Sequence, residues 1–298
     1  MARAAGHAKI RVGMTAERFA VIGDLQETSR LEFWREDNQA ERARLIARIV
    51  EQHPTFLVLL GDLVFDGSSE AHWKRFDALV APLVEARIPI VPILGNHDYW
   101  WGKRKNLRHY NERFPELDGN RWHRRRFESL ELVFLDSNFS AHSPVEREEQ
   151  TRWFARMLEE ADRDASCRGT LVFVHHPPFT NSSVSRDSAV VRRFFLRPFV
   201  GAEKTRAMLS GHVHSYERFE QAGKTFVVSG GGGGPRVRLF ADRRARHRDL
   251  YRGHAGPRRP MHYLSVGLTD RAVSFEVIGL DEKRISFATM ETFGLELL

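Results

Sequence analysis

The sequence predicts an α/β fold with four layers (α/β/β/α), in which two mixed β-sheets pack face to face and helices cover the outside. Two observations carry this prediction. Short apolar segments alternate with segments of helical periodicity over roughly the first two thirds of the chain, and short strands without intervening helices follow after about residue 205. A chain of 298 residues with 42% hydrophobic content can also bury the large core that this fold needs.

The expected strands of the first part are short, continuously apolar and rich in β-branched and aromatic residues. This pattern is typical of strands that are buried on both faces. Most of these segments end in a cluster of polar residues. They are Phe19 to Ile22, Phe56 to Leu60, Ile88 to Leu94, Leu132 to Leu135 and Leu171 to Val174.

Helices are expected between these strands, where apolar residues recur at spacings of three and four. They cover Asn38 to Gln52, Glu70 to Ala86, Glu146 to Ala161 and Ser188 to Phe199. A strand followed by a helix, repeated along the chain, indicates a mainly parallel sheet with covering helices.

The last third of the chain predicts a second, more antiparallel sheet that packs on the first. Its expected strands are Ala207 to Leu209, Thr225 to Ser229, His262 to Val266 and Ala272 to Val277. Nine arginines and only two acidic residues lie between Arg236 and Arg259, which indicates a mobile loop. Because no repeat and no Pro/Ser-rich hinge divides the chain, we expect one domain over 1–298, with the motifs in 19–218, a loop over 235–260 and C-terminal strands over 261–290.

Charge and cysteine content narrow the class of protein. The net charge is +7, and only seven of the 46 basic residues are lysines. Arginine suits bidentate recognition of phosphate, although a bias toward Arg codons explains the composition equally well. Cys167 is the only cysteine, so an internal disulfide and a CxxC zinc site are excluded. With no apolar run near the ~18 residues that span a bilayer, we expect a soluble cytoplasmic protein without membrane contact.

Polar side chains of the metal-ligand type follow five of the expected strands, and a glycine directly precedes four of these polar clusters. Because functional groups gather at the carboxyl ends of strands in open α/β sheets, we expect them to converge on one crevice. The five sequences are GDLQ with Asp24, GDLV with Asp62, GNHD with Asn96, His97 and Asp98, HHPP with His175 and His176, and GHVH with His212 and His214.

This mixture of donors suits particular ions and a particular reaction. Asp, Asn and His together favour Mn, Fe or Zn over Ca and Mg, which prefer all-oxygen ligand sets. Two such ions about 4 Å apart clamp the attacking and leaving oxygens of a displacement at phosphorus and activate a water molecule. The sequence therefore predicts a dinuclear metal centre that acts on a phosphate ester.

The ordered motif series is similar to that of the calcineurin-like metallophosphoesterases, and GHVHSYER most resembles the purple acid phosphatase branch. The resemblance spans roughly Ala20 to Arg218. It implies the calcineurin-like sandwich fold and hydrolysis of a phosphomonoester or phosphodiester by a hydroxide that two metal ions activate. The partner it implies is a phosphorylated small molecule or nucleotide, and the oligomeric state stays open.

The resemblance also implies a ligand set. Because the family's histidine ligand falls two residues before a proline, here Pro177, it favours His175, and the neighbouring His176 remains the alternative. Asp62 bridges the two ions. The first ion is held by Asp24 and His214, with Gln26 as a further candidate ligand, and the second by Asn96, His175 and His212.

His97 has a different implied role. It does not bind metal but lies beside the phosphoryl group, together with Asn96, and stabilises developing charge or protonates the leaving oxygen. His97 and Asp62 are therefore the expected catalytic residues. Asp98 either orients His97 or packs locally.

Two positions depart from the family pattern. Gln26 stands where most members have a histidine, so one ligand of the first metal is replaced by an amide oxygen or lost. Phe65 stands where purple acid phosphatases have the tyrosine that gives their colour, so no purple colour is expected and neither redox-active iron nor an acid optimum is inferred.

Two alternative functions stay open at this point. Clustered arginines and the Trp100-Trp101 pair are compatible with a nuclease or a cyclic-nucleotide phosphodiesterase, although nucleic acid is not the favoured partner. A catalytically silent metal-binding interaction module is the other alternative, and Gln26 is the feature in its favour. The other predicted ligands and His97 argue against it.

Overall fold

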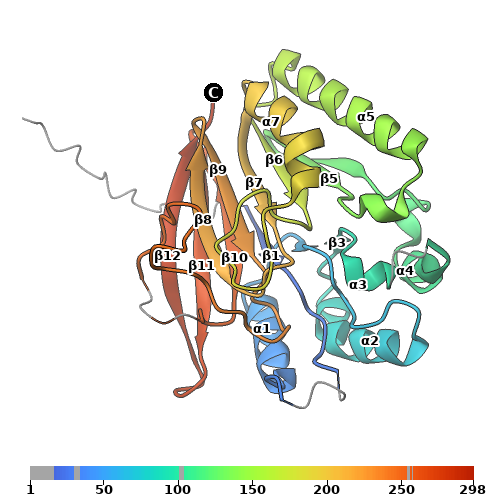
Figure 1. The fold of residues 1–298 in the computed structure, drawn as a ribbon, viewed down its shortest axis with the longest axis vertical. Helices are drawn as coiled ribbons and strands as arrows, with labels where there is room; N and C mark the ends of the chain where they lie inside the picture. The colour runs from blue at the N-terminus through green and yellow to red at the C-terminus, as the bar shows by residue number, and fades with distance from the viewer. Residues whose placement is uncertain (1–16, 30–33, 101–103, 254–255, 257) are drawn as a thin grey trace, which may run out of the picture.

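A computed structural model describes residues 17–29, 34–100, 104–253, 256 and 258–298. Two six-stranded β-sheets, here called sheets A and B, lie face to face, and helices cover their outer faces (Figure 1). Each sheet contains parallel and antiparallel strand pairs. The predicted four-layer sandwich of two mixed sheets is therefore confirmed.

Sheet A has the strand order β12-β11-β10-β1-β2-β3. The strands β1, β2 and β3 run parallel, and β10, β11 and β12 extend the sheet antiparallel from the β1 side. The bounds are Arg18–Ile22 for β1, Leu57–Leu59 for β2, Ile90–Pro92 for β3, His262–Leu268 for β10, Ala272–Asp281 for β11 and Ser286–Glu296 for β12.

Sheet B has the order β4-β5-β6-β7-β9-β8, in which the four central strands are parallel and both edge strands are antiparallel. The bounds are His123–Phe127 for β4, Leu130–Leu135 for β5, Gly169–Val174 for β6, Thr205–Ser210 for β7, Tyr216–Gln221 for β8 and Lys224–Ser229 for β9.

The expected helices all form, and the longest shows why. In α5, the Ser143 hydroxyl accepts the Glu146 N–H while the Glu146 carboxylate accepts the Ser143 N–H, and Pro144 occupies the first turn. The helices are α1 (Gln39–Glu51), α2 (Glu70–Glu85), α3 (Asn96–Tyr99), α4 (Arg108–Arg113), α5 (Pro144–Arg163), α6 (Ala189–Val191) and α7 (Arg197–Gly201), with 3-10 turns at Arg104–Leu107, Pro115–Leu117 and Phe139–Ala141 and a π-turn at Arg192–Leu196.

Three layers of buried side chains hold the sandwich together. The central layer fills the space between the sheets, with Phe19, Leu132 and Phe275 among its members. The layers outside are formed where α1 and α2 cover sheet A and where α5 and α7 cover sheet B. The apolar faces of these helices therefore pack on the sheets, as the spacing of their apolar residues predicts.

The strands of the last third do not form a sheet of their own, so that prediction was wrong. Strands β7 and β9 continue the parallel part of sheet B, whereas β10, β11 and β12 return to sheet A. Tertiary packing determines which strands are neighbours in a sheet, and the order of elements along the chain does not reveal this packing. The edge strands β4, β8 and β12 were not predicted; β4 carries three exposed arginines, a composition that only an edge strand tolerates.

The arginine-rich segment forms neither helix nor strand over its described residues, but it is not detached from the body of the protein. Leu239 and Tyr251 are buried within it. Arg246 donates to the carbonyl of Thr180, and Arg236 pairs with Glu36 at 3.0 Å. Several of its arginines therefore anchor the segment to neighbouring loops.

Among the described residues, no helix combines the length and the apolar character needed to cross a bilayer.

Glu217 in β8 makes a pH-dependent contribution to stability that can be measured. Thr180 Oγ and the Asn181 N–H donate to its carboxylate at 2.5 and 2.8 Å, and burial raises the pKa of Glu217 to about 7. Between pH 4.5 and 7 the unfolded chain loses this proton while the folded protein keeps it, so the wild type loses stability as the pH rises. The Glu217→Gln variant should therefore gain up to about 3 kcal/mol relative to wild type across this window.

Urea unfolding of both proteins at a series of pH values measures the difference. We expect little difference below about pH 4.5 and a plateau above about pH 7. A difference that stays constant over the whole range would show that Glu217 does not titrate in this window.

Candidate metal centre

The predicted ligands lie in sharp turns directly after the parallel strands. Asp24 follows β1, Asp62 follows β2 and His212 follows β7, and their φ angles of 60°, 51° and 66° are in the left-handed region. Such backbone is unfavourable for residues other than glycine and is concentrated at functional sites. The glycine before Asn96 is also required, because a Cβ on Gly95 would lie 2.2 Å from the Asp62 backbone nitrogen.

Four donor atoms form the first group of candidate ligands. Asn96 Oδ1 lies 3.1 Å from His175 Nε2 and 2.9 Å from His212 Nδ1. Asp62 Oδ2 lies 3.3 Å from the same His175 nitrogen. Ligands bound at 2.0–2.2 Å to one ion and at right angles to each other are separated by about 3 Å. The spacing of these donors therefore fits a shared metal ion.

A second group lies next to the first and shares Asp62 with it. Donor atoms of Asp24, Asp62 and His214 all lie within 4.8 Å of one another, with His214 Nε2 3.6 Å from Asp24 Oδ1. The Oε1 of Gln26 is buried and has no hydrogen-bond partner among the described residues, and Gln26 lines one pocket together with Asp62 and His214. An orphaned amide oxygen beside two carboxylates and an imidazole fits a metal ligand.

Backbone carbonyls set the orientation of two imidazole rings. The Nδ1–H of His175 donates to the Leu60 carbonyl at 2.7 Å, and that of His214 donates to the Pro235 carbonyl at 2.9 Å. Each bond leaves the Nε2 lone pair pointing toward the donor group. This is the arrangement by which proteins orient histidine ligands.

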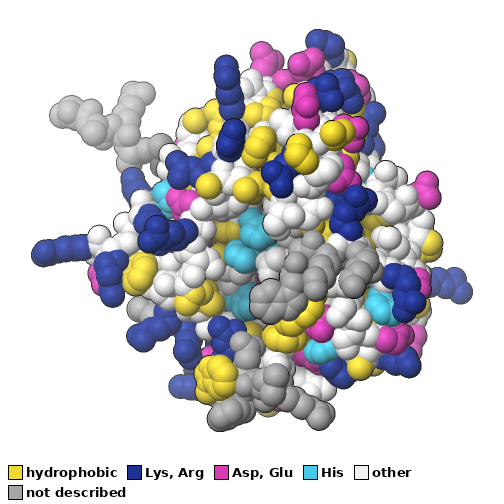
Figure 2. Space-filling view, turned by 45° about the vertical axis from the view of Figure 1, so that its right-hand side comes forward, with side chains coloured by type: hydrophobic (Ala, Val, Ile, Leu, Met, Phe, Trp, Pro, Cys, Tyr) yellow, Lys and Arg dark blue, Asp and Glu magenta, His cyan; other side chains and the backbone are white. Residues whose placement is uncertain are grey.

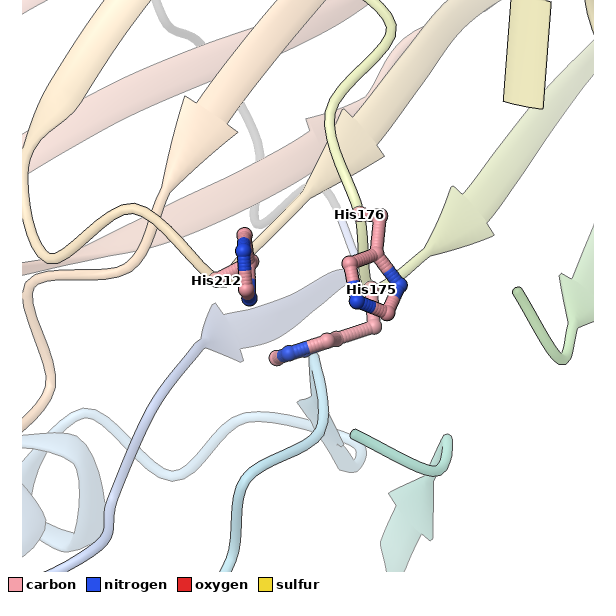
Figure 3. A group of neighbouring side chains, drawn as sticks. All are labelled: His175, His176 and His212. Atoms are coloured by element: carbon pink, nitrogen blue, oxygen red, sulfur yellow. The ribbon is translucent and has the colours of Figure 1, made fainter. Parts of the chain in front are cut away.

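His176 is close enough to be a further candidate ligand. Figure 3 shows that the rings of His175, His176 and His212 come from two neighbouring loops and meet around one space. The Nδ1 of His176 is 2.7 Å from Ser137 Oγ, whereas His175 contacts both Asn96 and Asp62. These contacts favour His175, as the proline spacing does.

The titratable groups of this centre are buried, and their pKa values are shifted from the usual ones. Burial raises the pKa of Asp24 well above its usual value. Burial also disfavours a charge on His175, yet the adjacent Asp62 carboxylate raises the pKa of that imidazole to about 9. Buried carboxylates of this kind require a positive charge among them, which a metal ion supplies as well as a proton does.

His97 is placed at the pocket and outside both donor groups. Its Nδ1–H donates to the Phe65 carbonyl at 2.6 Å, and its backbone N–H donates to Asp62 Oδ1 at 2.8 Å. The imidazole ring packs against Phe65 and Trp100, whose ring centroids lie 5.2 and 5.7 Å from its own. Nε2 is therefore the nitrogen that remains to meet a substrate.

Asp98 braces the centre and does not orient the His97 ring. Its carboxylate accepts the backbone N–H groups of Asp62, Leu63 and Gly95 at 2.8–3.0 Å. These bonds join the loops after β2 and β3. Of the two roles considered for Asp98, the contacts favour local packing.

The donor groups open into a cavity of about 230 Å³. Histidine side chains gather near the middle of the face shown in Figure 2. Sequence reasoning named six of the lining residues as site residues, but it missed Glu27, Arg35, Val184, Pro235 and Val237. It also missed Ser137, although the polar run Asp136-Ser137-Asn138 directly follows the apolar strand β5 and repeats the strand-end pattern. Trp101 lies outside the described residues.

One more group of potential ligands occurs elsewhere in the described part of the chain. It consists of Glu70, His109 and Glu112 near the surface. Both glutamates are exposed, and Arg113 lies 3.6 Å from Glu70. An ordinary ion-pair network accounts for this group.

Comparisons with known proteins agree with the fold. The structure of GAP50, the anchor in the inner membrane complex of Plasmodium, matches with a TM-score of 0.70 over 95% of this chain and 89% of that chain, at 16% identity. This likeness concerns the fold alone.

Sequence relatives are also similar. Purple acid phosphatase 22 of Arabidopsis thaliana is 25% identical over 68% of this chain and 45% of its own length. A probable cyclic nucleotide phosphodiesterase of Rhodopseudomonas palustris is 32% identical over 47% of this chain and 50% of its own length. The chain thus spans about half the length of these curated relatives.

The family model described as calcineurin-like phosphoesterase matches residues 17–216, which contain all five motifs. This match covers more than half of the chain. The chain therefore belongs to the calcineurin-like phosphoesterase family.

Proposed function

We propose that this protein is a hydrolase that cleaves a phosphate ester with the help of two metal ions. The observation that carries the proposal is the pair of adjacent donor groups that share Asp62, at the carboxyl ends of the parallel strands. A single ion needs only one such group. Two groups with a common carboxylate fit a dinuclear centre.

The proposed ligand sets follow from the contacts. Asp24, Gln26 and His214 would hold one ion, Asn96, His175 and His212 would hold the other, and Asp62 would serve both. Bound ions of this kind lower the pKa of a water molecule and neutralise charge on phosphoryl oxygens. The nitrogen and oxygen donors favour Mn, Fe or Zn. The single cysteine, Cys167, is compatible with a cytoplasmic location.

Residues of the chain perform the remaining steps. Asn96 lines the pocket and, as well as binding metal, contacts the phosphoryl group. His97 keeps Nδ1 bonded to the Phe65 carbonyl, so it acts at Nε2, where it stabilises the charge that develops on the phosphoryl group or holds the proton that the leaving oxygen takes up. Phe65 and Trp100 keep the ring in place and limit the access of water to one side of it.

The test is hydrolysis of a chromogenic phosphomonoester and a matched phosphodiester by chelator-treated protein, with Mn, Fe, Zn, Ni, Co or Mg added back singly. We expect no turnover without metal and turnover with at least one transition metal. If no ion restored hydrolysis of either ester, although two ions were bound, the proposal of an enzyme of this class would fail.

Cyclic-nucleotide hydrolysis is the second candidate function. The relative from Rhodopseudomonas palustris that carries this activity in its name favours it. Under this alternative the protein hydrolyses the diester and a cyclic nucleotide with a higher kcat/KM than the monoester. A preference for the monoester would exclude it.

A substitution at Gln26 tests the proposed ligand set. Gln26→His replaces an amide oxygen, which is a weak donor, with an imidazole, so we expect one of the two ions to bind about tenfold more tightly. Competition of the protein with a fluorescent chelator measures both affinities.

The matched control is Gln52→His, which adds an imidazole at the exposed end of α1. It should change neither affinity. If Gln26→His also left both affinities unchanged, Gln26 would not be a metal ligand.

A further inference from the structure

A second groove continues from the metal pocket along the surface. Its volume is about 290 Å³, and it shares Arg35, Val184, Pro235 and Val237 with the pocket that contains the donor groups. A substrate whose phosphoryl group lies at the donor groups would therefore extend into this groove. The groove is formed by three segments, 34–36, 183–184 and 235–238, together with Arg258.

The groove is strongly basic. Four arginines line it, Arg35, Arg236, Arg238 and Arg258, and Glu36 is the one carboxylate among its described lining residues; with Glu282, which pairs with Arg236, the formal charge is +4 − 2 = +2. Figure 2 shows Lys and Arg side chains to the left of and below the histidines on this face. A concave surface with this charge concentrates anions and holds them by charge-assisted hydrogen bonds.

The arginines of the groove differ in whether a carboxylate of the protein already forms an ion pair with them. Arg236 binds Glu36 at 3.0 Å and Glu282 at 2.7 Å, and Arg258 binds Glu36 at 3.2 Å. These pairs fix the walls of the groove. No carboxylate pairs with Arg238 among the described residues, and its side chain is exposed.

The backbone at Arg238 is nevertheless held in place. The Ser183 N–H donates to the Arg238 carbonyl at 2.9 Å, and Ser182 forms a β-bridge with Leu239. The guanidinium therefore projects from a fixed point on the wall. A guanidinium anchored through its backbone, with no carboxylate partner among the described residues, is the part of the groove best suited to bind an anion.

The groove also has apolar surface for the body of a substrate. Trp34 is 69% exposed and Val184 is 68% exposed, both unusual for large apolar side chains in this protein. An indole offers a flat face to an organic ring. The groove therefore offers both an apolar surface and an excess of positive charge to a ligand.

We propose that this groove is a second-anion subsite, in which Arg238 binds a second phosphate group of a substrate whose first phosphate is hydrolysed at the metal centre. The inference rests on the proposed function and narrows the substrate to organic phosphates that carry two phosphate groups. Arg238 determines specificity and takes no part in the hydrolysis itself. Its contribution lies in KM and not in kcat.

The test compares adenosine 5′-monophosphate, adenosine 5′-diphosphate and adenosine 3′,5′-bisphosphate as competitive inhibitors of chromogenic monoester hydrolysis. They share the adenosine body, so differences in the inhibition constant report on the second phosphate. We expect at least one of the two doubly phosphorylated compounds to bind about tenfold more tightly than the monophosphate, with a preference that falls as salt increases.

Two variants make the test specific. Arg238→Gln should reduce the preference to about one while leaving kcat for the chromogenic ester unchanged. Arg243→Gln removes an exposed arginine of the same segment that does not line the groove, and it should leave the preference intact. Equal inhibition by all three compounds, or a preference that survives in Arg238→Gln, would overturn the proposal.

The outcome also separates this inference from the proposed function. If the chromogenic ester is not hydrolysed, the proposed function fails, and the same three affinities are measured by calorimetry on the metal-loaded protein. If the ester is hydrolysed but the preference is absent, only the second-anion subsite fails.

Discussion

Replacement of Asp62 by alanine should remove both metal ions and lower hydrolysis to the background rate. Asp62 is the carboxylate that both donor groups share, and it is almost fully buried. Its loss removes the carboxylate beside His175 and leaves the second group with Asp24 as its one carboxylate. Elemental analysis after gel filtration, combined with the chromogenic assay, measures metal content and rate on the same sample.

Two further variants separate loss of metal from loss of fold. Asp62→Asn keeps the shape of the side chain and an oxygen that accepts the His97 N–H, so it should fold and still bind metal weakly. Asp270→Ala removes an exposed carboxylate in the turn between β10 and β11, at the opposite end of sheet A, and should leave both properties unchanged. Full turnover with two ions in Asp62→Ala would refute the bridging role.

Replacement of His97 by alanine should leave both ions bound and reduce kcat by about 10² to 10⁴-fold, the usual range for a general acid. His97 lies outside both donor groups, and its Nδ1 is bonded to the Phe65 carbonyl. Only Nε2 is left to act on the substrate. Metal content and kcat, measured together, should therefore respond differently to this substitution.

Rescue by a small molecule distinguishes a catalytic role for His97 from a structural one. Added imidazole should restore part of the rate of His97→Ala, because the cavity left by the ring opens onto the pocket. A purely structural histidine would not show this rescue. Loss of metal in His97→Ala would contradict its placement outside the ligand sets.

Local signals explain why the donor groups could be predicted from the sequence. A buried strand that ends in glycine and a polar residue was enough to find Asp24, Asp62, Asn96 and His212, because left-handed turns after parallel strands concentrate side chains at one edge. The polar run after β5 that contains Ser137 has no glycine before it, so this rule does not single it out.

Long-range contacts explain what the sequence did not reveal. The arginine-rich segment reads as a solvated loop, but Arg236 is bonded to Glu36 and Asn181 accepts the Arg246 and His247 N–H groups. These partners lie 65 to 200 residues apart, and no local pattern signals them. The assignment of strands to the two sheets failed for the same reason.

The most direct test of the dinuclear account is a titration of chelator-treated protein with Mn²⁺, in which bound metal and hydrolysis of the chromogenic monoester are recorded together. The account predicts that the protein binds two equivalents and that turnover develops mainly as the second one binds, since both donor groups must be filled. Full activity with one equivalent, or activity without any metal, would contradict it.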